Sequence, residues 1–531
     1  MIISTFEITY SSFARVCLAM LVVLALYRMS HPRSIVAKVP GPPSPSWIFG
    51  HMLQLLLPPQ YGSYEFQWQK VYGPVYRIKG CFGQERLVVS DPLALQCIFN
   101  PETFDHAPAL EKVGYLIQGP LSLSYLKGKD HIYKRAWLTR ELAERLETLS
   151  APTVNVWDFI GTATLSAVSE SMDIFLGLGK SDPFKVVFGI PLQEMGEELT
   201  KNFHDMVMLA CSLSPASILL DAIIITYLPA SAIVALSWLP TRPFTILRNI
   251  RDLASKLGYR LVREKLDSAQ KGVDMDKDIY GLLLARNMHR SQDALSEDEI
   301  AGQTALMLTG GQDTAANALS FALMELARNP ALQDNLRAEI HSVLTAGGER
   351  IAYDTMPLLN ALIKASVLVL RFYPGLPLLD RICLQDTNIP LKNSITTTSG
   401  ERITAIAVRK GQIVTPALAS YNRLESRWGS DAHEFRPSRW IDGTVVSHSE
   451  DAVGPYANLG TFLGGPRTCL GWRFAILEMQ VILCTVISKF SFQIPPGTEA
   501  DMIGRPKFAN VLTPALPNGD QGVILHIGRI V

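Results

Sequence analysis

The sequence predicts a mainly α-helical protein with a small β region, and two observations carry this prediction. Helical patterns dominate, and the longest runs from Ser296–Glu299, where acidic residues occupy the first turn, to Arg328. Short β-branched runs at Arg402–Val408 and Gly522–Ile527 predict strands of a minor sheet. Because no internal repeat divides the 531 residues, we expect most of them to form one large domain.

The composition excludes nucleic acid as the main partner and indicates apolar surroundings. Lys+Arg and Asp+Glu both number 49, so the chain lacks the basic excess that phosphate binding requires. Only 18% of the residues are charged, against about 25% in typical soluble domains. This deficit predicts membrane contact or large buried surfaces.

The cysteines predict reduced thiols that face a cytosolic environment. Their number is odd, their spacing is wide and no CxxC motif occurs, which argues against a disulfide framework or a zinc site. They are Cys17, Cys81, Cys97, Cys211, Cys383, Cys469 and Cys484.

Residues 1–38 predict a membrane anchor with a basic flank. The apolar run Val16–Tyr27 is shorter than the roughly 20 residues of a bilayer span, but looser apolar sequence precedes it. Arg28, Arg33 and Lys38 follow, which favours an uncleaved, single-pass anchor in the endoplasmic reticulum membrane with the rest of the chain in the cytosol. An interfacial helix is the alternative.

Prolines mark the next boundary and interrupt a second apolar stretch. The prolines of Val39–Pro45 forbid a helix and predict a stiff hinge, so the main domain should cover residues 39–531. Ile218–Leu239 resembles a transmembrane helix in length, but Asp221 and Pro229 divide it into short pieces. We expect a surface segment that dips into the membrane or lines a lipophilic entrance.

The segment FLGGPRTCLG at residues 462–471 carries the most specific chemistry in the chain. A heme iron that splits dioxygen benefits from a thiolate ligand, which Cys469 can supply. Gly465 and Gly471 permit tight turns that aim backbone N–H groups at the sulfur, and the helix expected after the cysteine adds a positive dipole end. A buried cysteine in a glycine-rich turn is the alternative.

Two further residues of this segment suit a heme. Arg467 can pair with a heme propionate, and Phe462 can cover the proximal side. The pattern FxxGxRxCxG resembles the signature of the cytochrome P450 family of heme-thiolate monooxygenases, and chance would produce it in about one of 10^4 chains of this length. The resemblance covers residues 36–531 and implies the cytochrome P450 fold with heme b bound through Cys469.

A glycine pair interrupts the long helical pattern at Gly310-Gly311-Gln312-Asp313-Thr314. Two adjacent glycines cost a helix interior about 2 kcal/mol relative to alanine, which is easier to explain if something approaches the backbone. The pentad resembles the oxygen-binding stretch of the family. The resemblance implies that Gly310 and Gly311 leave room for dioxygen, that Thr314 donates a hydrogen bond during oxygen activation and that Asp313 relays protons. A plain kinked helix is the alternative.

Other residues match the family by position. Phe435–Trp440, preceded by Trp428–Asp431, resembles the meander segment, in which Arg439 belongs to a buried ion network. His131 and Arg135, four residues apart on an expected helix, and Arg381, after a Pro-Gly-Leu-Pro stretch, are implied as partners of the heme propionates. A solvated surface position is the alternative for each.

The chain departs from the family at one structural motif. The family carries Glu-x-x-Arg on the helix before the Pro-Gly-x-Pro stretch; Arg371 fits the arginine, but Leu368 stands in the place of the glutamate. Without that glutamate, we expect Arg371 and Arg439 to be unpaired buried cations unless another acid reaches them. Replacing Ala365–Leu368 by one glutamate restores the family pattern, so we hypothesise an error of gene modelling or a damaging insertion.

The resemblance implies insertion of one oxygen atom from O2 into a lipophilic small molecule, with a terpenoid-like secondary metabolite as the expected class. No dinucleotide-binding or flavin segment is present in the sequence, so NADPH-cytochrome P450 reductase would deliver the electrons. The expected apolar lining comes from Leu110–Leu126, Ala305–Gly310 and Leu376–Leu379. The alternatives are a heme-thiolate isomerase or dehydratase that uses no O2, and a catalytically impaired heme protein.

Sequencing the transcript tests the hypothesis about Ala365–Leu368. We expect a transcript that encodes one glutamate in place of these four residues, because that change restores both the motif and its spacing. A transcript that encodes Ala365–Leu368, together with normal heme binding and turnover by its product, would contradict the hypothesis.

Overall fold

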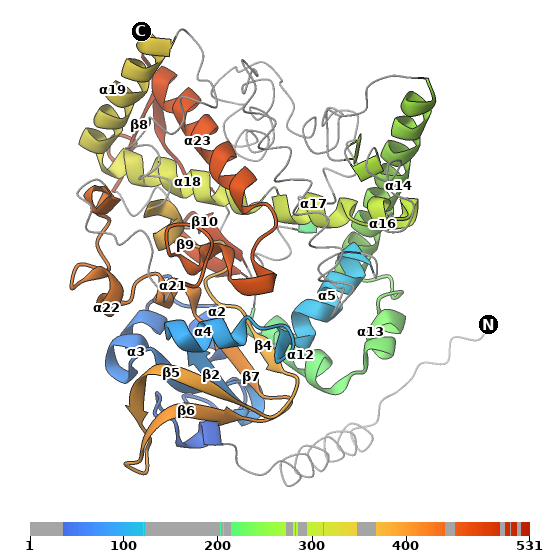
Figure 1. The fold of residues 1–531 in the computed structure, drawn as a ribbon, viewed down its shortest axis with the longest axis vertical. Helices are drawn as coiled ribbons and strands as arrows, with labels where there is room; N and C mark the ends of the chain where they lie inside the picture. Colours follow the sequence, from blue (N-terminus) through green and yellow to red (C-terminus); the bar gives the residue numbers. More distant parts are fainter. Residues whose placement is uncertain are drawn as a thin grey trace.

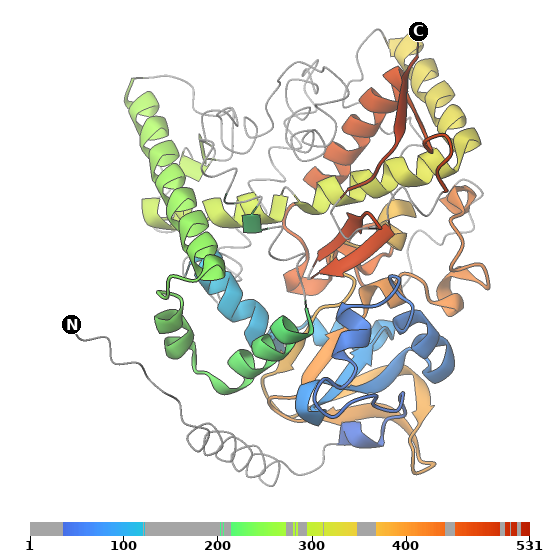
Figure 2. The ribbon, with the colours of Figure 1, turned by 180° about the vertical axis from the view of Figure 1, so that it is seen from behind.

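The computed structural model has a mainly helical architecture, as predicted, with a smaller β-rich part (Figures 1 and 2). The described residues are 35–119, 122, 202, 205–206, 214–271, 280–281, 283–284, 295–311, 313–347, 368–440, 452–499, 505–509, 511–517 and 522–530. The predicted anchor run Val16–Tyr27 lies outside them, as do His131 and Arg135.

In Figure 1 most of the helices lie in the upper and right parts of the molecule, and the β-rich part lies at the lower left. The α-helices are α2 (Met52–Leu56), α3 (Glu65–Tyr72), α4 (Pro92–Ile98), α5 (Pro108–Gln118), α12 (Pro215–Tyr227), α13 (Ala230–Leu236), α14 (Arg242–Gln270), α16 (Glu297–Ala301), α17 (Thr304–Gly311), α18 (Asp313–Arg328), α19 (Pro330–Gly347), α21 (Leu418–Tyr421), α22 (Glu425–Trp428) and α23 (Trp472–Lys489). The 3₁₀ turns are η1 (Ile35–Lys38), η2 (Cys81–Gly83), η4 (Pro437–Trp440), η5 (Gly460–Phe462) and η6 (Gly465–Arg467).

The described strands form a five-stranded sheet of order β1-β2-β7-β4-β3 and three two-stranded sheets, β9–β10, β8–β11 and β5–β6. They are β1 (Val75–Lys79), β2 (Glu85–Val89), β3 (Phe104–His106), β4 (Arg381–Cys383), β5 (Thr387–Thr396), β6 (Arg402–Val408), β7 (Ile413–Pro416), β8 (Phe490–Gln493), β9 (Arg505–Ala509), β10 (Val511–Ala515) and β11 (His526–Arg529). Only the β2–β7 pair of the large sheet is parallel. The prediction for Arg402–Val408 is confirmed, whereas the last strand begins at His526 and not at Gly522.

The long helical pattern after Ser296 is interrupted once within the described residues, between α16 and α17. Its start is a capping box, in which the Ser296 side chain accepts from the Glu299 N–H and the Glu299 carboxylate accepts from the Ser296 N–H. The break falls at Gly302 and Gln303. The glycine pair closes the described part of α17, and α18 follows from Asp313 after Gln312, which lies outside the described residues.

The apolar stretch Ile218–Leu239 is divided as predicted. Helix α12 ends at Tyr227, and α13 begins after Pro229, whose fixed φ and missing N–H prevent a continuous helix. Large apolar side chains of this stretch are exposed, among them Trp238 at 75% and Leu220 at 56%. Among the helices that the structure describes, none has the length and hydropathy to cross a bilayer.

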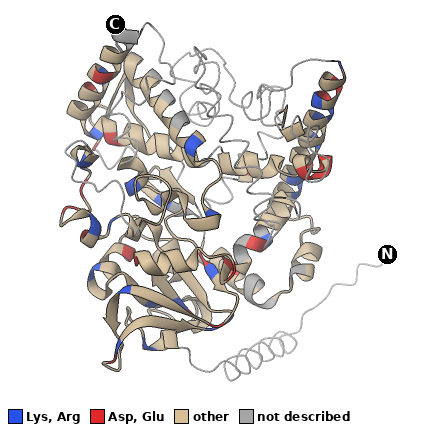
Figure 3. Cartoon of the chain, viewed as in Figure 1, with Lys and Arg blue, Asp and Glu red and all other residues tan. Residues whose placement is uncertain are grey.

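The helices pack so that α17 and α18 cross the middle of the molecule (Figures 1 and 2). Helix α14 packs against α16, α17 and α5, and α18 shares one hydrophobic core with α19 and α23. Phe462 belongs to that core, which fixes the loop before α23 to the central helices. Charges of both signs alternate along α14, whereas α17 carries none (Figure 3).

Arg371 is fully buried, and backbone carbonyl groups replace the missing carboxylate. Its two terminal nitrogens donate to the carbonyl oxygens of Asn422, Ala432 and Glu434 at 2.7–3.1 Å. Burial, followed by the neighbouring arginines 423 and 439, lowers the pKa of Arg371 to about 9, so the side chain stays charged at neutral pH. The guanidinium also lies over the rings of Phe372 and Trp428, at 4.5 and 5.0 Å.

Arg439 has an acidic partner. Its Nη2 lies 2.6 Å from the Asp431 carboxylate, and its Nη1 donates to the Trp428 carbonyl at 2.7 Å. The expectation that Arg371 and Arg439 are unpaired cations is therefore wrong. The physical reason is that the meander segment supplies carbonyl oxygens to one arginine and a carboxylate to the other.

One donor of Arg371 remains buried without a partner, and it predicts the effect of restoring the acid. The Nε atom has no hydrogen-bond partner within the described part of the chain, and Leu368 lies one helical turn earlier. We expect Leu368→Glu to be more stable than the matched, uncharged Leu368→Gln by about 1–3 kcal/mol, because a carboxylate can accept from this donor. Urea unfolding followed by circular dichroism measures the difference. Equal stability of the two variants would show that the carbonyl oxygens already neutralise Arg371.

Candidate active site

The loop before α23 holds Cys469 in a closed turn. The Cys469 N–H donates to the Phe462 carbonyl at 2.8 Å, and the Thr468 hydroxyl donates to the Gly465 carbonyl at 2.7 Å. Among the cysteines that the structure describes, only Cys469 is exposed. Helix α23 begins three residues later at Trp472, so its positive end lies next to the cysteine in the chain.

Glycines make this loop conformation accessible. Gly465 has a φ of +58°, which other residues adopt only with strain. At Gly464, a Cβ atom would lie 2.2 Å from the Val453 carbonyl oxygen, so the backbone of the loop packs directly against a neighbouring segment. Gly471 has an ordinary φ of −91°, and the space where its Cβ would stand is open among the described atoms. The tight turn expected at Gly471 is therefore not the reason for that glycine.

Two buried arginines lie beside this loop. Arg467, from the loop, has its Nη2 2.9 Å from the Asp105 carboxylate. Arg381, from β4, donates from Nη1 to His106 Nδ1 at 3.0 Å. The pairing of β3 with β4 brings Asp105 and His106 to these arginines. Because Nδ1 accepts, this contact requires the neutral histidine with its proton on Nε2.

The arginine pair still lacks acceptors. Burial and then the nearby Arg467 lower the pKa of Arg381 to about 10, so both side chains are cationic at neutral pH. Three of their nitrogens, Arg381 Nε and Nη2 and Arg467 Nε, are buried with no hydrogen-bond partner in the described structure. Unsatisfied charged donors are costly to bury, so this site favours an anionic ligand with several oxygens. The propionates of the predicted heme fit this requirement.

The helix pair α17–α18 leaves open space at the glycines. Gly310 and Gly311 are exposed, and no described atom lies within 4 Å of where their Cβ atoms would stand. The Thr314 hydroxyl donates to the Gly310 carbonyl at 3.0 Å. Its methyl group lies near Gly375, in the stretch between Arg371 and Arg381. The side chain of Asp313 lies outside the described part of the structure.

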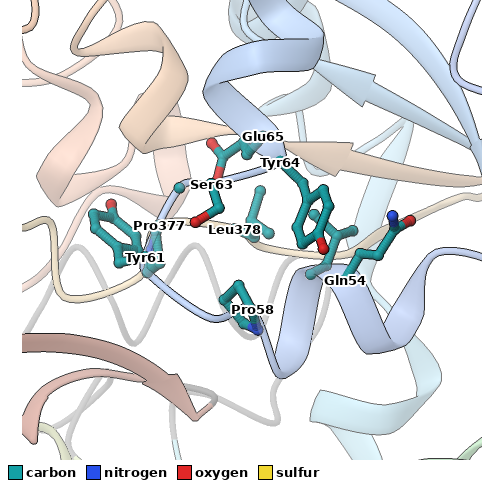
Figure 4. A pocket seen from close by; sticks show the side chains of 10 residues that line it. Gln54, Pro58, Tyr61, Ser63, Tyr64, Glu65, Pro377 and Leu378 are labelled. Carbon is teal, nitrogen blue, oxygen red and sulfur yellow. The ribbon is translucent and has the colours of Figure 1, made fainter. Parts of the chain in front are cut away.

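A shallow pocket elsewhere in the molecule is separate from these residues. It lies between α2 and α3 and is bordered by Pro377 and Leu378 (Figure 4). The Glu65 carboxylate on its wall accepts from the Ser420 hydroxyl at 2.6 Å, and burial raises the pKa of Glu65 to about 7. Its lining includes no residue of the cysteine loop or of α17–α18, so it is not the centre of the predicted chemistry.

The structure thus adds residues that the sequence did not single out. Asp105 and His106 carry no motif, and only the register of β3 against β4 brings them to the arginines. His131 and Arg135, which were expected to contribute further cations, fall outside the described residues and stay a prediction.

Comparison with known proteins gives a consistent result. The family model described as "Cytochrome P450" matches residues 40–519. Cytochrome P450 monooxygenase 91 of Postia placenta is 29% identical over 494 residues, which cover 86% of this chain and 88% of the relative. Cytochrome P450 monooxygenases claQ and claO of Ampulloclitocybe clavipes are 27% and 28% identical over 517 and 521 residues. These alignments cover 92% of this chain and 92% and 93% of the relatives.

Removing the thiol of Cys469 tests its assignment as the iron ligand. We expect the reduced wild-type protein to show the red-shifted Soret band of a thiolate–heme complex with carbon monoxide, and Cys469→Ser to lose that band completely. Cys97→Ser is the matched control, because Cys97 lies in α4 and is only partly exposed. The assignment fails if Cys469→Ser retains the band or if Cys97→Ser abolishes it.

Proposed function

Because the chain belongs to the cytochrome P450 family, we propose that it inserts one oxygen atom of O2 into a lipophilic small molecule, with electrons from a separate NADPH-cytochrome P450 reductase. The protein is a heme-dependent monooxygenase, the activity named for its relatives. The observation that best supports the proposal is the exposed Cys469 in a fixed loop beside two buried cations. For the substrate class, we propose a terpenoid-like secondary metabolite.

Heme, when bound through a thiolate, supplies the reductive activation of O2. The residues of the chain have separate tasks in this proposal. Cys469 provides the thiolate, and the positive end of α23 stabilises its charge. Arg381 and Arg467 bind the propionates through their unsatisfied N–H groups.

Thr314 has the chemistry of a proton donor in the open space beside the glycines. Its hydroxyl now donates to the Gly310 carbonyl, and rotation about χ1 redirects that proton without breaking the helix. We propose that Thr314 holds and moves the proton that oxygen activation requires, with Asp313 as the next group toward solvent. This role favours a monooxygenase over an isomerase or dehydratase that uses no O2.

The apolar surfaces support a lipophilic substrate and contact with a membrane. Helix α17 carries no charged residue, and Ala305 and Leu308 on it are buried. The exposed Leu220, Trp238 and Leu239 of the α12–α13 segment are suited to the apolar boundary of a bilayer. We propose an enzyme held at the endoplasmic reticulum membrane by residues 1–38, with its catalytic domain in the cytosol.

Isotope incorporation tests the proposed reaction. Incubation with the reductase, NADPH, ¹⁸O₂ and a panel of terpenoid-like lipophiles should give a product that carries one ¹⁸O atom, detected by mass spectrometry. In Thr314→Ala, we expect heme binding to persist while product per NADPH falls by about 10²-fold or more, because proton delivery is disturbed. A wild-type product that lacks ¹⁸O would refute the oxygen insertion, and unchanged coupling in Thr314→Ala would remove this residue from the mechanism.

A further inference from the structure

The last residue of α5 is joined to the helix that carries the glycine pair. Gln118 Nε2 donates to Thr309 Oγ1 at 2.9 Å, and Gln118 Oε1 accepts from the Ser122 hydroxyl at 3.2 Å. Thr309 directly precedes Gly310, and both Gln118 and Thr309 are half-buried. Figures 1 and 2 show α5 between α17 and the α12–α13 segment, and α5 packs against each of these helices.

This polar pair stands in apolar surroundings. Leu116 on α5, and Ala305 and Leu308 on α17, are at most 9% exposed. Placing an amide and a hydroxyl in such a wall costs desolvation that two apolar side chains would avoid. The pair therefore needs a reason beyond packing.

The Gln118–Thr309 hydrogen bond is not needed to hold α5 in place, because other contacts already fix this helix. Lys112 Nζ donates to the Leu228 carbonyl at 3.0 Å, which ties α5 to the turn between α12 and α13. The Arg251 guanidinium of α14 lies 5.6 Å from the centre of the Tyr115 ring. These contacts fix α5 on two sides without the Gln118 amide.

The hydrogen bonds of Thr309 allow the amide to change partners. The Thr309 hydroxyl donates to the Ala305 carbonyl at 2.8 Å, so its proton stays satisfied if Gln118 turns away. The amide stays satisfied too if a ligand oxygen takes the place of Thr309 Oγ1 as its acceptor. When a ligand oxygen replaces Thr309 Oγ1, both the amide of Gln118 and the hydroxyl of Thr309 keep a hydrogen-bond acceptor. A site of this kind can select a ligand that carries an oxygen atom, because a ligand without one would not replace the lost hydrogen bond.

We propose that Gln118 and Thr309 form a polar subsite beside the open space at Gly310 that hydrogen-bonds a carbonyl or hydroxyl oxygen already present on the lipophilic substrate. This inference rests on the proposed function and deepens it. The oxygen bound at Gln118 fixes the orientation of an otherwise apolar molecule beside Gly310, and so decides which carbon faces the open space. The substrate must then already carry an oxygen atom when it reaches this enzyme. An earlier reaction therefore either adds that oxygen or leaves an existing one in place.

Matched ligand pairs test the subsite in the full-length, heme-loaded protein. The pairs are adamantane with 2-adamantanone, decalin with 2-decalone, and androstane with androstan-17-one. The Kd of each ligand comes from the shift of the heme Soret band on titration. The ratio of the ketone Kd to the hydrocarbon Kd is then compared between variants, which cancels differences in aqueous solubility.

The proposal and the alternative of a structural contact predict opposite patterns. We expect Gln118→Met to raise this ratio about fivefold to tenfold, the value of one hydrogen bond, in at least one pair. We expect Thr309→Val to leave the ratio unchanged or to lower it, because the amide loses its competing acceptor. If the pair only held α5 in place, both variants would change the ratio in the same direction and to the same extent.

Three results would overturn the proposed subsite. The first is a ketone-to-hydrocarbon Kd ratio in Gln118→Met that stays within twofold of the wild-type ratio for every ligand pair. The second is an equal change of this ratio in Gln118→Met and Thr309→Val, and the third is the absence of any Soret shift with all six ligands. The carbon monoxide spectrum of each variant shows that it has folded with its heme. Loss of that spectrum in the wild-type protein would instead refute the proposed function. The two failures are therefore distinguishable.

Discussion

Two buried guanidinium groups, on Arg381 and Arg467, constrain the structure around the cysteine loop. Arg381 comes from β4 and Arg467 from the loop itself, so the contacts around the two side chains connect the sheet to the segment that carries Cys469. Asp105 neutralises part of this charge, and His106 accepts one further hydrogen bond. The remaining donors need anionic oxygens, which the heme propionates would supply in the proposed function. Cofactor binding and the stability of this junction are therefore coupled.

The network around Arg371 shows how a fold keeps a buried cation after it loses the usual acid. Removing one partner of a buried ion pair typically costs about 3–5 kcal/mol when nothing replaces it. Here three carbonyl oxygens and two aromatic rings surround the guanidinium, and Asp431 serves Arg439. Carbonyl dipoles stabilise a cation without adding a second charge that must be desolvated. The meander segment therefore has to keep its backbone conformation, because that conformation supplies the acceptors.

Much of the fold could be predicted from the sequence, since local patterns determine much of it. The strand at Arg402–Val408 follows from β-branched residues, the capping box at Ser296 from its residue types, and the break at Pro229 from a missing N–H. The break between α16 and α17 was missed, because the pattern carries no signal strong enough to place it at Gly302.

The site was predictable only where a motif spans a few residues. The segment around Cys469 is contiguous, so the turn at Gly465 and the helix after the cysteine could be read from the sequence, whereas the turn expected at Gly471 was wrong. Asp105 and His106 were missed because they meet the arginines only through the register of two strands. Gln118 lies within the expected lining Leu110–Leu126, but its contact with Thr309 depends on the packing of two helices. The carbonyl acceptors of Arg371 were missed for a further reason. Every residue has a carbonyl group, so the sequence gives no indication of which ones converge on a cation.

The threonines of α17 and α18 explain how a helix with two glycines stays ordered beside open space. Thr309 donates to the Ala305 carbonyl and Thr314 to the Gly310 carbonyl, so each hydroxyl bonds the backbone one turn before it. Such bonds satisfy carbonyls that a bend would otherwise leave unpaired, and they favour bending at the same time. The two glycines lie between these threonines. The backbone is therefore most easily deformed between Thr309 and Thr314, where the proposed substrate contact and the proposed proton donor lie five residues apart on one segment. Under these two proposals, a ligand that draws Gln118 away from Thr309 would act directly on that segment and would link substrate orientation to proton delivery.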